Sequence, residues 1–193
     1  MRSIIIYIFG YALLVGFFLI EHFVRKGKDT KDMNRTKFDK KSTTFVSIAM
    51  GTALILLICS PLLNYLKICN AFNIWVSIIG IILGTTGLII RYFALSTLGR
   101  FFTRILRETE NHTLITSGIY KYIRHPGYLS DLLIFIGLSL TMGNWLSLII
   151  VPIMFILAYI YRIHVEEKML LKIFGEQYKS YQKNSKMIIP YIY

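Results

Sequence analysis

The chain has 193 residues, a length that fits one domain. Hydrophobic residues make up 55% of it and charged residues 17%, and its long charge-free stretches exclude an ordinary soluble globular protein. The aromatic content of 15% also excludes intrinsic disorder. The formal net charge of +12 would suit a nucleic-acid partner unless the basic residues follow a membrane topology.

Three charge-free runs in the first half of the chain predict membrane-spanning helices. They cover residues 3–20, 42–66 and 68–90. Each is close to the roughly 20 apolar residues that a helix needs to cross a bilayer. These runs predict three spans in the first half of the chain.

A fourth charge-free run, residues 132–161, is too long for one straight span. As a single helix it would measure about 45 Å, against a hydrocarbon core of about 30 Å. Gly143-Asn144 offers a turn near its middle, so we expect two antiparallel spans over 127–142 and 145–161. The predicted fold is all-α, a polytopic membrane protein with about five transmembrane helices.

The basic residues are distributed unevenly along the chain. Three segments, 25–41, 99–124 and 162–186, hold 19 of the 22 Lys and Arg residues. With five spans these segments fall on one side of the membrane, which the positive-inside rule makes cytoplasmic. The N-terminus then lies outside in a multi-pass protein, in the plasma membrane if the cell is bacterial. Topology and anionic lipid explain the net charge without nucleic acid.

Polar residues gather in two segments on the predicted cytoplasmic side. In the first, His125-Pro126 precedes a span, and proline suits the first turn of a helix. The backbone amides that follow would then face the cytoplasm and suit an anion or a carboxylate. The alternative is that Arg124 and His125 only anchor the helix at the membrane interface.

The second polar segment continues from the last predicted span. Arg162 and Glu166 are four residues apart and therefore share one face of a helix. They form either a surface ion pair or part of a site, and Glu167 is expected to face water. An amphipathic pattern follows, which predicts a cytoplasmic C-terminal helix that lies on the membrane or packs on the first polar segment.

Three other ionisable residues lie within or at the end of the spans. Arg91 is expected to anchor the third span at the interface, and Glu21 to close the first. Asp131 lies one turn into a span, where an ionised carboxylate is costly unless it is paired. We expect it to pair with Arg124 or Arg162, or to serve the site.

In these polar segments the sequence resembles the isoprenylcysteine carboxyl methyltransferase family. The resemblance rests on HTLITSGIY at 112–120, RHPGY at 124–128, the Glu pair at 166–167 and GEQYKSY at 175–181. It covers about residues 107–193, whereas the three N-terminal spans fit only in number and hydrophobicity. Although RHPGY alone would be a weak signal, its distance from the Glu pair makes the match specific.

The resemblance implies an integral membrane methyltransferase that uses S-adenosylmethionine, bound in a cytoplasmic pocket between the last spans and the C-terminal helix. Arg162 matches the position that binds the acceptor's carboxylate, and Arg162, Glu166 and His125 are expected to carry the catalysis. By the same resemblance, the residues at cofactor-binding positions are His112, Thr113, Leu114, Ile115, Tyr120, His125, Pro126, Gly127, Tyr128 and Glu166. No metal site is expected, because the four histidines lack the spacing of metal ligands.

We expect a single domain over 1–193, in which 1–95 supplies three spans and a basic loop. The part 96–193 bears the motifs and contains the helical hairpin 127–161. The acceptor is expected to be a lipophilic small molecule or lipidated protein that carries a carboxylate, such as a prenylcysteine C-terminal carboxyl. The alternatives are a phospholipid-amine or thiol methyltransferase, an NADPH-dependent enoyl reductase of the sterol type, and a non-catalytic membrane scaffold. The oligomeric state does not follow from the sequence.

Overall fold

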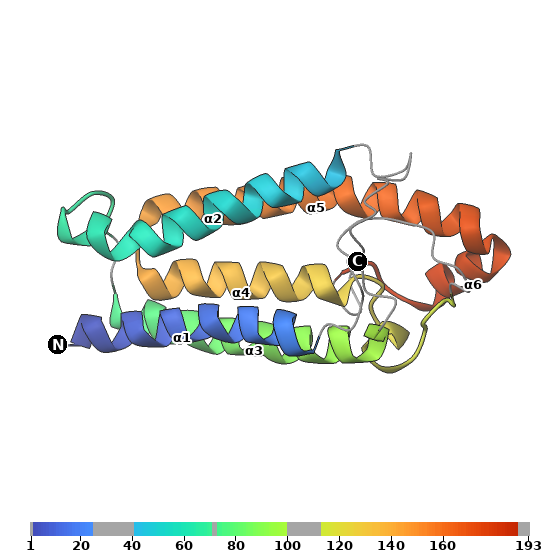
Figure 1. The fold of residues 1–193 in the computed structure, drawn as a ribbon, viewed down its shortest axis with the longest axis horizontal. Helices are drawn as coiled ribbons and strands as arrows, with labels where there is room; N and C mark the ends of the chain where they lie inside the picture. Colours follow the sequence, from blue (N-terminus) through green and yellow to red (C-terminus); the bar gives the residue numbers. More distant parts are fainter. Residues whose placement is uncertain (1, 25–40, 71–72, 100–112, 189–193) are drawn as a thin grey trace.

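The computed structural model describes residues 2–24, 41–70, 73–99 and 113–188. Within that part of the chain, five long helices run side by side along the long axis, and a sixth, short helix turns back at one end (Figure 1). The prediction of an all-α fold is confirmed. In chain order the elements are α1 (Arg2–Phe23), α2 (Ser42–Tyr65), α3 (Ile74–Leu98), the 3-10 helix η2 (Gly118–Lys121), α4 (Pro126–Met142), α5 (Trp145–Phe174) and α6 (Glu176–Asn184).

Four helices in the described part, α1, α2, α3 and α5, are long and apolar enough to cross a membrane. The remaining predicted span, α4, is the fourth in chain order; it is apolar but has only 17 residues, about 26 Å of helix, which is at the short limit for a span. Large apolar side chains such as Ile82, Ile153 and Leu157 are exposed on the outside of the bundle, as expected where lipid is the solvent. The multi-pass membrane architecture is confirmed.

The third helix begins and ends later than predicted. Lys67 and Cys69 adopt positive φ angles of 60° and 54°, which a continuing helix does not allow. α3 therefore starts only at Ile74, where the Asn73 side chain accepts hydrogen bonds from the first free amides. The helix then runs on to Leu98, so that the third span includes Arg91.

The predicted hairpin turn is confirmed. Gly143 ends α4 with φ 59° and ψ 47°, the left-handed conformation that glycine adopts readily. The Asn144 side chain then caps α5 by accepting a hydrogen bond from the amide of Leu146 at 3.1 Å. α5 continues without a break to Phe174, so the helix that carries Arg162 is the direct extension of the last span.

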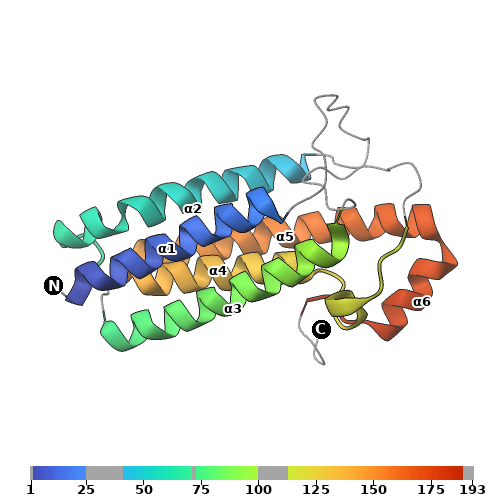
Figure 2. The same ribbon diagram turned by 60° about the horizontal axis from the view of Figure 1, so that its bottom comes forward.

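α3 and α4 approach each other most closely, and Figure 2 shows them running next to each other. A Cβ atom on Gly137 would lie 2.5 Å from the Gly84 amide nitrogen and 2.6 Å from the Gly80 carbonyl oxygen. Only glycine permits this distance, and close contact through small residues is how helices pack in membranes. The contact fixes α4, whose first turn carries the second half of the RHPGY motif.

A buried amide network closes the end of the bundle at which the N-terminus lies (Figure 1). Asn144 Nδ2 donates to Asn64 Oδ1 at 2.8 Å and to the Ile68 carbonyl at 2.9 Å. Asn64 Nδ2 in turn donates to the Met142 carbonyl at 2.7 Å. These bonds join α2 to the turn between α4 and α5. All the polar motifs of the sequence lie at the opposite end.

Candidate active site

A pocket with a cavity of about 520 Å³ occupies the polar end of the bundle. Its walls come from all six helices and from the segment 113–115. Pro126 begins α4 and is not among the lining residues, and His112 lies outside the described residues. The predicted site residues that do line it are Thr113, Leu114, Ile115, Tyr120, His125, Gly127, Tyr128, Arg162 and Glu166.

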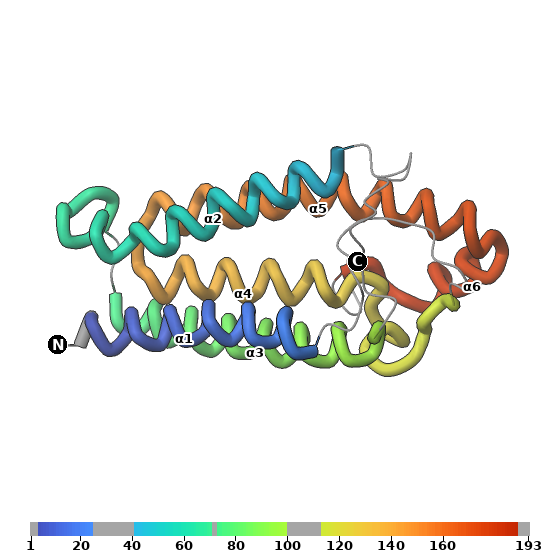
Figure 3. Tube along the Cα trace, viewed as in Figure 1, coloured from blue at the N-terminus to red at the C-terminus, as the bar shows by residue number. Residues whose placement is uncertain are grey.

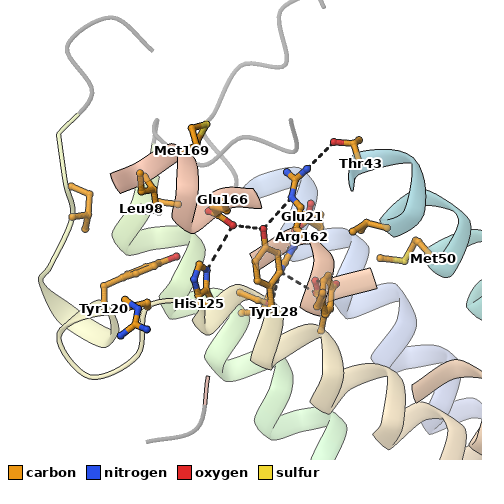
Figure 4. A pocket seen from close by; sticks show the side chains of 18 of the residues that line it. Glu21, Thr43, Met50, Leu98, Tyr120, His125, Tyr128, Arg162, Glu166 and Met169 are labelled. Carbon is orange, nitrogen blue, oxygen red and sulfur yellow. Dashed lines mark hydrogen bonds and ion pairs between the residues drawn. The ribbon is translucent and has the colours of Figure 1, made fainter. Parts of the chain in front are cut away.

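The two sides of the pocket differ in chemistry. In Figure 4, Tyr120 and Leu98 lie to one side of the His125–Glu166 pair, and Thr43 and Met50 lie to the other. The side formed by α1 and α2 is mostly apolar, with Phe17, Phe18, Val46, Met50 and Leu54. One pocket thus combines the polar side chains of His125, Arg162 and Glu166, which we call its polar end, with the apolar side chains on α1 and α2, which we call its apolar arm.

Arg162, Tyr128 and Glu166 form a hydrogen-bonded chain between these two sides. The Tyr128 hydroxyl donates to Glu166 Oε2 at 2.6 Å, and Arg162 Nε donates to the Tyr128 oxygen at 3.3 Å. Arg162 Nη1 also donates to Ser42 Oγ at 2.9 Å and to Thr43 Oγ1 at 2.8 Å. These hydroxyls orient the buried guanidinium without neutralising its charge. The sequence motifs do not indicate the hydroxyls of Ser42 and Thr43 on α2.

His125 lies between two carboxylates from adjacent positions on α5. Its Nδ1 is 3.7 Å from Glu166 Oε2, and its Nε2 is 3.3 Å from Glu167 Oε1. The expectation that Glu167 faces water is wrong, since its side chain is only 14% exposed and accepts a hydrogen bond from Arg124 Nε at 2.8 Å. The His125 ring also stacks on Tyr128, with centroids 5.5 Å apart. Each ring nitrogen of His125 therefore lies near a carboxylate, and one face of the ring stacks on Tyr128.

The segment after α6 holds the backbone of this histidine. The amide of Arg124 donates to the Lys186 carbonyl at 2.8 Å, and that of His125 donates to the Met187 carbonyl at 3.1 Å. The Lys186 amide returns a bond to the Tyr122 carbonyl at 2.9 Å. The GEQY motif therefore has a structural role, because α6 brings the chain back to pair with the RHPGY segment (Figure 3).

α6 also fixes η2, which carries Tyr120. The Tyr181 hydroxyl donates to the Tyr120 carbonyl at 2.6 Å. Burial raises the pKa of Tyr181 to about 12, although the nearby Arg124 opposes the shift. The phenol is therefore a hydrogen-bond donor throughout the neutral range.

The expected anion site at the start of α4 is only partly available. The amides of Tyr128 and Leu129 both donate to the His125 carbonyl at 3.2 Å. They are satisfied within their own turn, because the His125 carbonyl is already placed to accept the first helical bonds. A ligand carboxylate at this end therefore depends on side chains more than on these two amides.

The interface position expected for Arg91 and the partners expected for Asp131 are wrong, whereas Glu21 lies near the end of α1 as expected, and Asp131 lines the pocket. Arg91 is 6% exposed and does not extend to the membrane interface, and its Nη1 lies 3.0 Å from Asp131 Oδ1. Arg91 Nε donates to Glu21 Oε1 at 3.0 Å. Asp131 is thus paired with Arg91 rather than with Arg124 or Arg162. The three residues come from three helices, so no local spacing could indicate the contact.

The comparisons with known proteins agree on one family. The model of the "Isoprenylcysteine carboxyl methyltransferase (ICMT) family" matches residues 80–172. A "Probable protein-S-isoprenylcysteine O-methyltransferase" of Oryza sativa subsp. indica is 29% identical over 160 residues, which cover 79% of this chain and 84% of that protein. "Protein-S-isoprenylcysteine O-methyltransferase A" of Arabidopsis thaliana is 33% identical over 120 residues, 61% of either chain.

The fold is also similar to a solved structure. The structure of the eukaryotic intramembrane Ras methyltransferase ICMT, solved without a monobody, matches with a TM-score of 0.68 and 25% sequence identity. The match covers all of this chain and 68% of that one. Across the described residues, no group of three or more His, Cys, Asp or Glu side chains is arranged to hold a metal ion.

Proposed function

From the relationship to the isoprenylcysteine carboxyl methyltransferase family, which the family model, the curated relatives and the solved structure all support, we propose that this chain is an integral membrane methyltransferase. It transfers a methyl group from S-adenosylmethionine to the carboxylate of a lipophilic acceptor. The observation that carries the proposal is the position of Arg162, Tyr128 and Glu166 between a polar pocket end and an apolar arm.

The polar end of the pocket offers groups that suit S-adenosylmethionine, which when bound supplies an electrophilic methyl group on a sulfonium. The Glu166 carboxylate accepts a bond from Tyr128 and has further lone pairs for an ammonium or ribose hydroxyls. Tyr120 lines the same end with an aromatic ring that can face adenine or a sulfonium cation. His125 and the segment 113–115 complete this wall.

The acceptor's carboxylate would bind to Arg162. The guanidinium would attract the carboxylate by charge-assisted hydrogen bonding, and Ser42 and Thr43 keep it oriented through Nη1. A carboxylate is ionised at neutral pH, so the reaction requires no general base. This is the reason that a carboxyl acceptor fits better than an ammonium or a thiol, both of which must first lose a proton.

The lipid part of the acceptor would occupy the apolar arm between α1 and α2, with access from the bilayer. The relatives are named for S-isoprenylcysteine, and we propose a prenylcysteine carboxyl or a similar small lipid acid as the acceptor. Holding both reactants in one pocket converts a bimolecular reaction into an oriented one, which is the main contribution the protein can make to methyl transfer. We further propose that 1–193 acts as one domain whose pocket end is cytoplasmic.

A labelling experiment tests this proposal. Purified protein in detergent is given S-adenosylmethionine with a radioactive methyl group, together with N-acetyl-S-farnesylcysteine. The expected product is a methyl ester, which mild alkali hydrolyses to volatile labelled methanol. N-acetyl-S-farnesylcysteine has neither a free amine nor a free thiol, so label that resists alkali would indicate an amine or thiol acceptor that was purified together with the protein. Binding of NADPH without any transfer would indicate the reductase, and neither binding nor transfer would leave a non-catalytic scaffold.

A further inference from the structure

A buried ionic cluster of Glu21, Arg91 and Asp131 forms part of the pocket wall. The three residues come from α1, α3 and α4 and are each at most 6% exposed. Arg91 binds Glu21 through Nε at 3.0 Å and lies 3.0 Å from Asp131 through Nη1. The Tyr159 hydroxyl on α5 donates to Asp131 Oδ2 at 2.6 Å. The cluster therefore joins four of the membrane helices at one level.

Stability alone does not explain such a cluster. Removing several charges from water is costly, and apolar residues of similar volume often give equal or greater stability. Ionisable groups inside a membrane protein are accordingly rare and usually have a functional task. The contacts that lead from the cluster to His125, Tyr128 and Glu166 indicate that task.

Two routes connect Arg91, on one part of the pocket wall, to the residues around Glu166. In the first, Arg91 Nη1 donates to the Gly127 carbonyl at 3.0 Å, and Gly127 lies between His125 and Tyr128 in the chain. In the second, Asp131 binds Tyr159, whose ring stacks on Tyr128 with centroids 4.6 Å apart. Both routes end at residues that contact Glu166.

We propose that Arg91 is a positioning residue for methyl transfer. Held by Glu21 and Asp131, it fixes the first turn of α4 through the Gly127 carbonyl, and so sets how His125 and Tyr128 face Glu166. The planar guanidinium can meet both carboxylates and the carbonyl at once, whereas an ammonium at the end of a flexible chain cannot. The catalytic part of this inference rests on the proposed function, but the geometric part does not.

The test compares Arg91→Lys with Asn64→Leu as a matched control. Asn64→Leu also disrupts a buried polar network between helices, but at the opposite end of the bundle. Two quantities are measured: kcat for methyl transfer to N-acetyl-S-farnesylcysteine, and the imidazole nitrogen NMR signals of His125 in ligand-free protein. The His125 signals are assigned with His125→Gln. Thermal unfolding records the stability of each variant.

We expect Arg91→Lys to move the His125 signals and to lower kcat by about tenfold to a hundredfold. Asn64→Leu should lower the unfolding temperature but leave the signals and kcat at the parent values. Parental signals and kcat in Arg91→Lys would overturn the inference, as would the same shift in Asn64→Leu. If the parent transfers no methyl group, the proposed function fails, and the His125 signals still decide the positioning role. If Arg91→Lys does not fold, Asp131→Asn replaces it, because it keeps an acceptor for Tyr159 while removing the charge beside Arg91, and the same criteria apply.

Discussion

The hydroxyl of Tyr128 donates to Glu166 Oε2 at 2.6 Å, a charge-assisted bond that joins the first turn of α4 to the part of α5 that extends past the last predicted span. The two residues are 38 positions apart, and each belongs to a different motif of the sequence. Hydrogen bonds to charged groups contribute about 1.5–3 kcal/mol, more than neutral ones. This bond sets the orientation of the carboxylate that we propose to receive the cofactor.

Tyr128→Phe removes this donor and keeps the aromatic ring that stacks between His125 and Tyr159. We expect the Kd for S-adenosylmethionine to rise about tenfold, which corresponds to the loss of about 1.4 kcal/mol. Isothermal titration calorimetry measures it. The control is Tyr122→Phe, at an exposed tyrosine outside the pocket, and should bind as the parent does. Equal Kd values in the two variants would show that the Tyr128 hydroxyl does not organise the cofactor site.

Thr43→Val removes one of the hydroxyls that orient Arg162. Because the guanidinium is then less restrained, we expect the KM for a carboxylate acceptor to rise by about threefold to tenfold, with an unchanged Kd for S-adenosylmethionine. Steady-state kinetics at saturating cofactor measures the KM for the acceptor, and calorimetric titration measures the Kd for S-adenosylmethionine. Ser47→Ala, one turn further along the same pocket wall, is the control. A change in cofactor affinity instead of acceptor KM would place Arg162 on the cofactor side.

Substitutions at Gly51 test whether the lipid chain of the acceptor occupies the apolar arm. This glycine lines the pocket, and a Cβ atom added there would meet nothing within 4 Å. Gly51→Ala should therefore retain activity, whereas Gly51→Leu should fill the arm and abolish transfer to a farnesylated acceptor. Both variants should bind S-adenosylmethionine normally in a calorimetric titration. Full activity of Gly51→Leu would mean that the acceptor chain does not pass α2.

Tyr181 gives a prediction for alkaline pH. Its pKa in the folded protein is about 12, above the ordinary value of about 10, because the phenol is buried. The stability that it contributes is fully present below pH 10 and is lost as the pH rises through 12. Ultraviolet difference titration of the parent against Tyr181→Phe should show the missing phenol ionising near pH 12. Ionisation of that phenol near pH 10 would contradict its buried bond to the Tyr120 carbonyl.

The spans and the hairpin could be predicted because they depend on local properties. Charge-free runs locate helices that are solvated by lipid, and Gly143-Asn144 supplies a turn residue and a cap. The start of α3 could not be predicted in this way. It depends on Lys67 and Cys69 adopting positive φ angles that neither residue type favours.

The candidate site was indicated in part by spacing and in part by the family resemblance. Helical spacing places Arg162 and Glu166 on one face, and the motifs add His125 and Tyr128, which line the same pocket. Spacing could not reveal partners that come from distant segments. Arg91 contacts Glu21, which is 70 positions away in the sequence. The backbone of Arg124 and His125 is held by the segment that follows α6.

The central claim is that Glu166 helps to hold S-adenosylmethionine in this pocket. Calorimetric titration of the parent, Glu166→Gln and Glu176→Gln tests it most directly, because Glu176 is an exposed carboxylate on α6 that does not line the pocket. We predict binding by the parent and by Glu176→Gln, with affinity at least about tenfold weaker in Glu166→Gln. Equal affinity in all three proteins, or no binding by the folded parent, would contradict the claim.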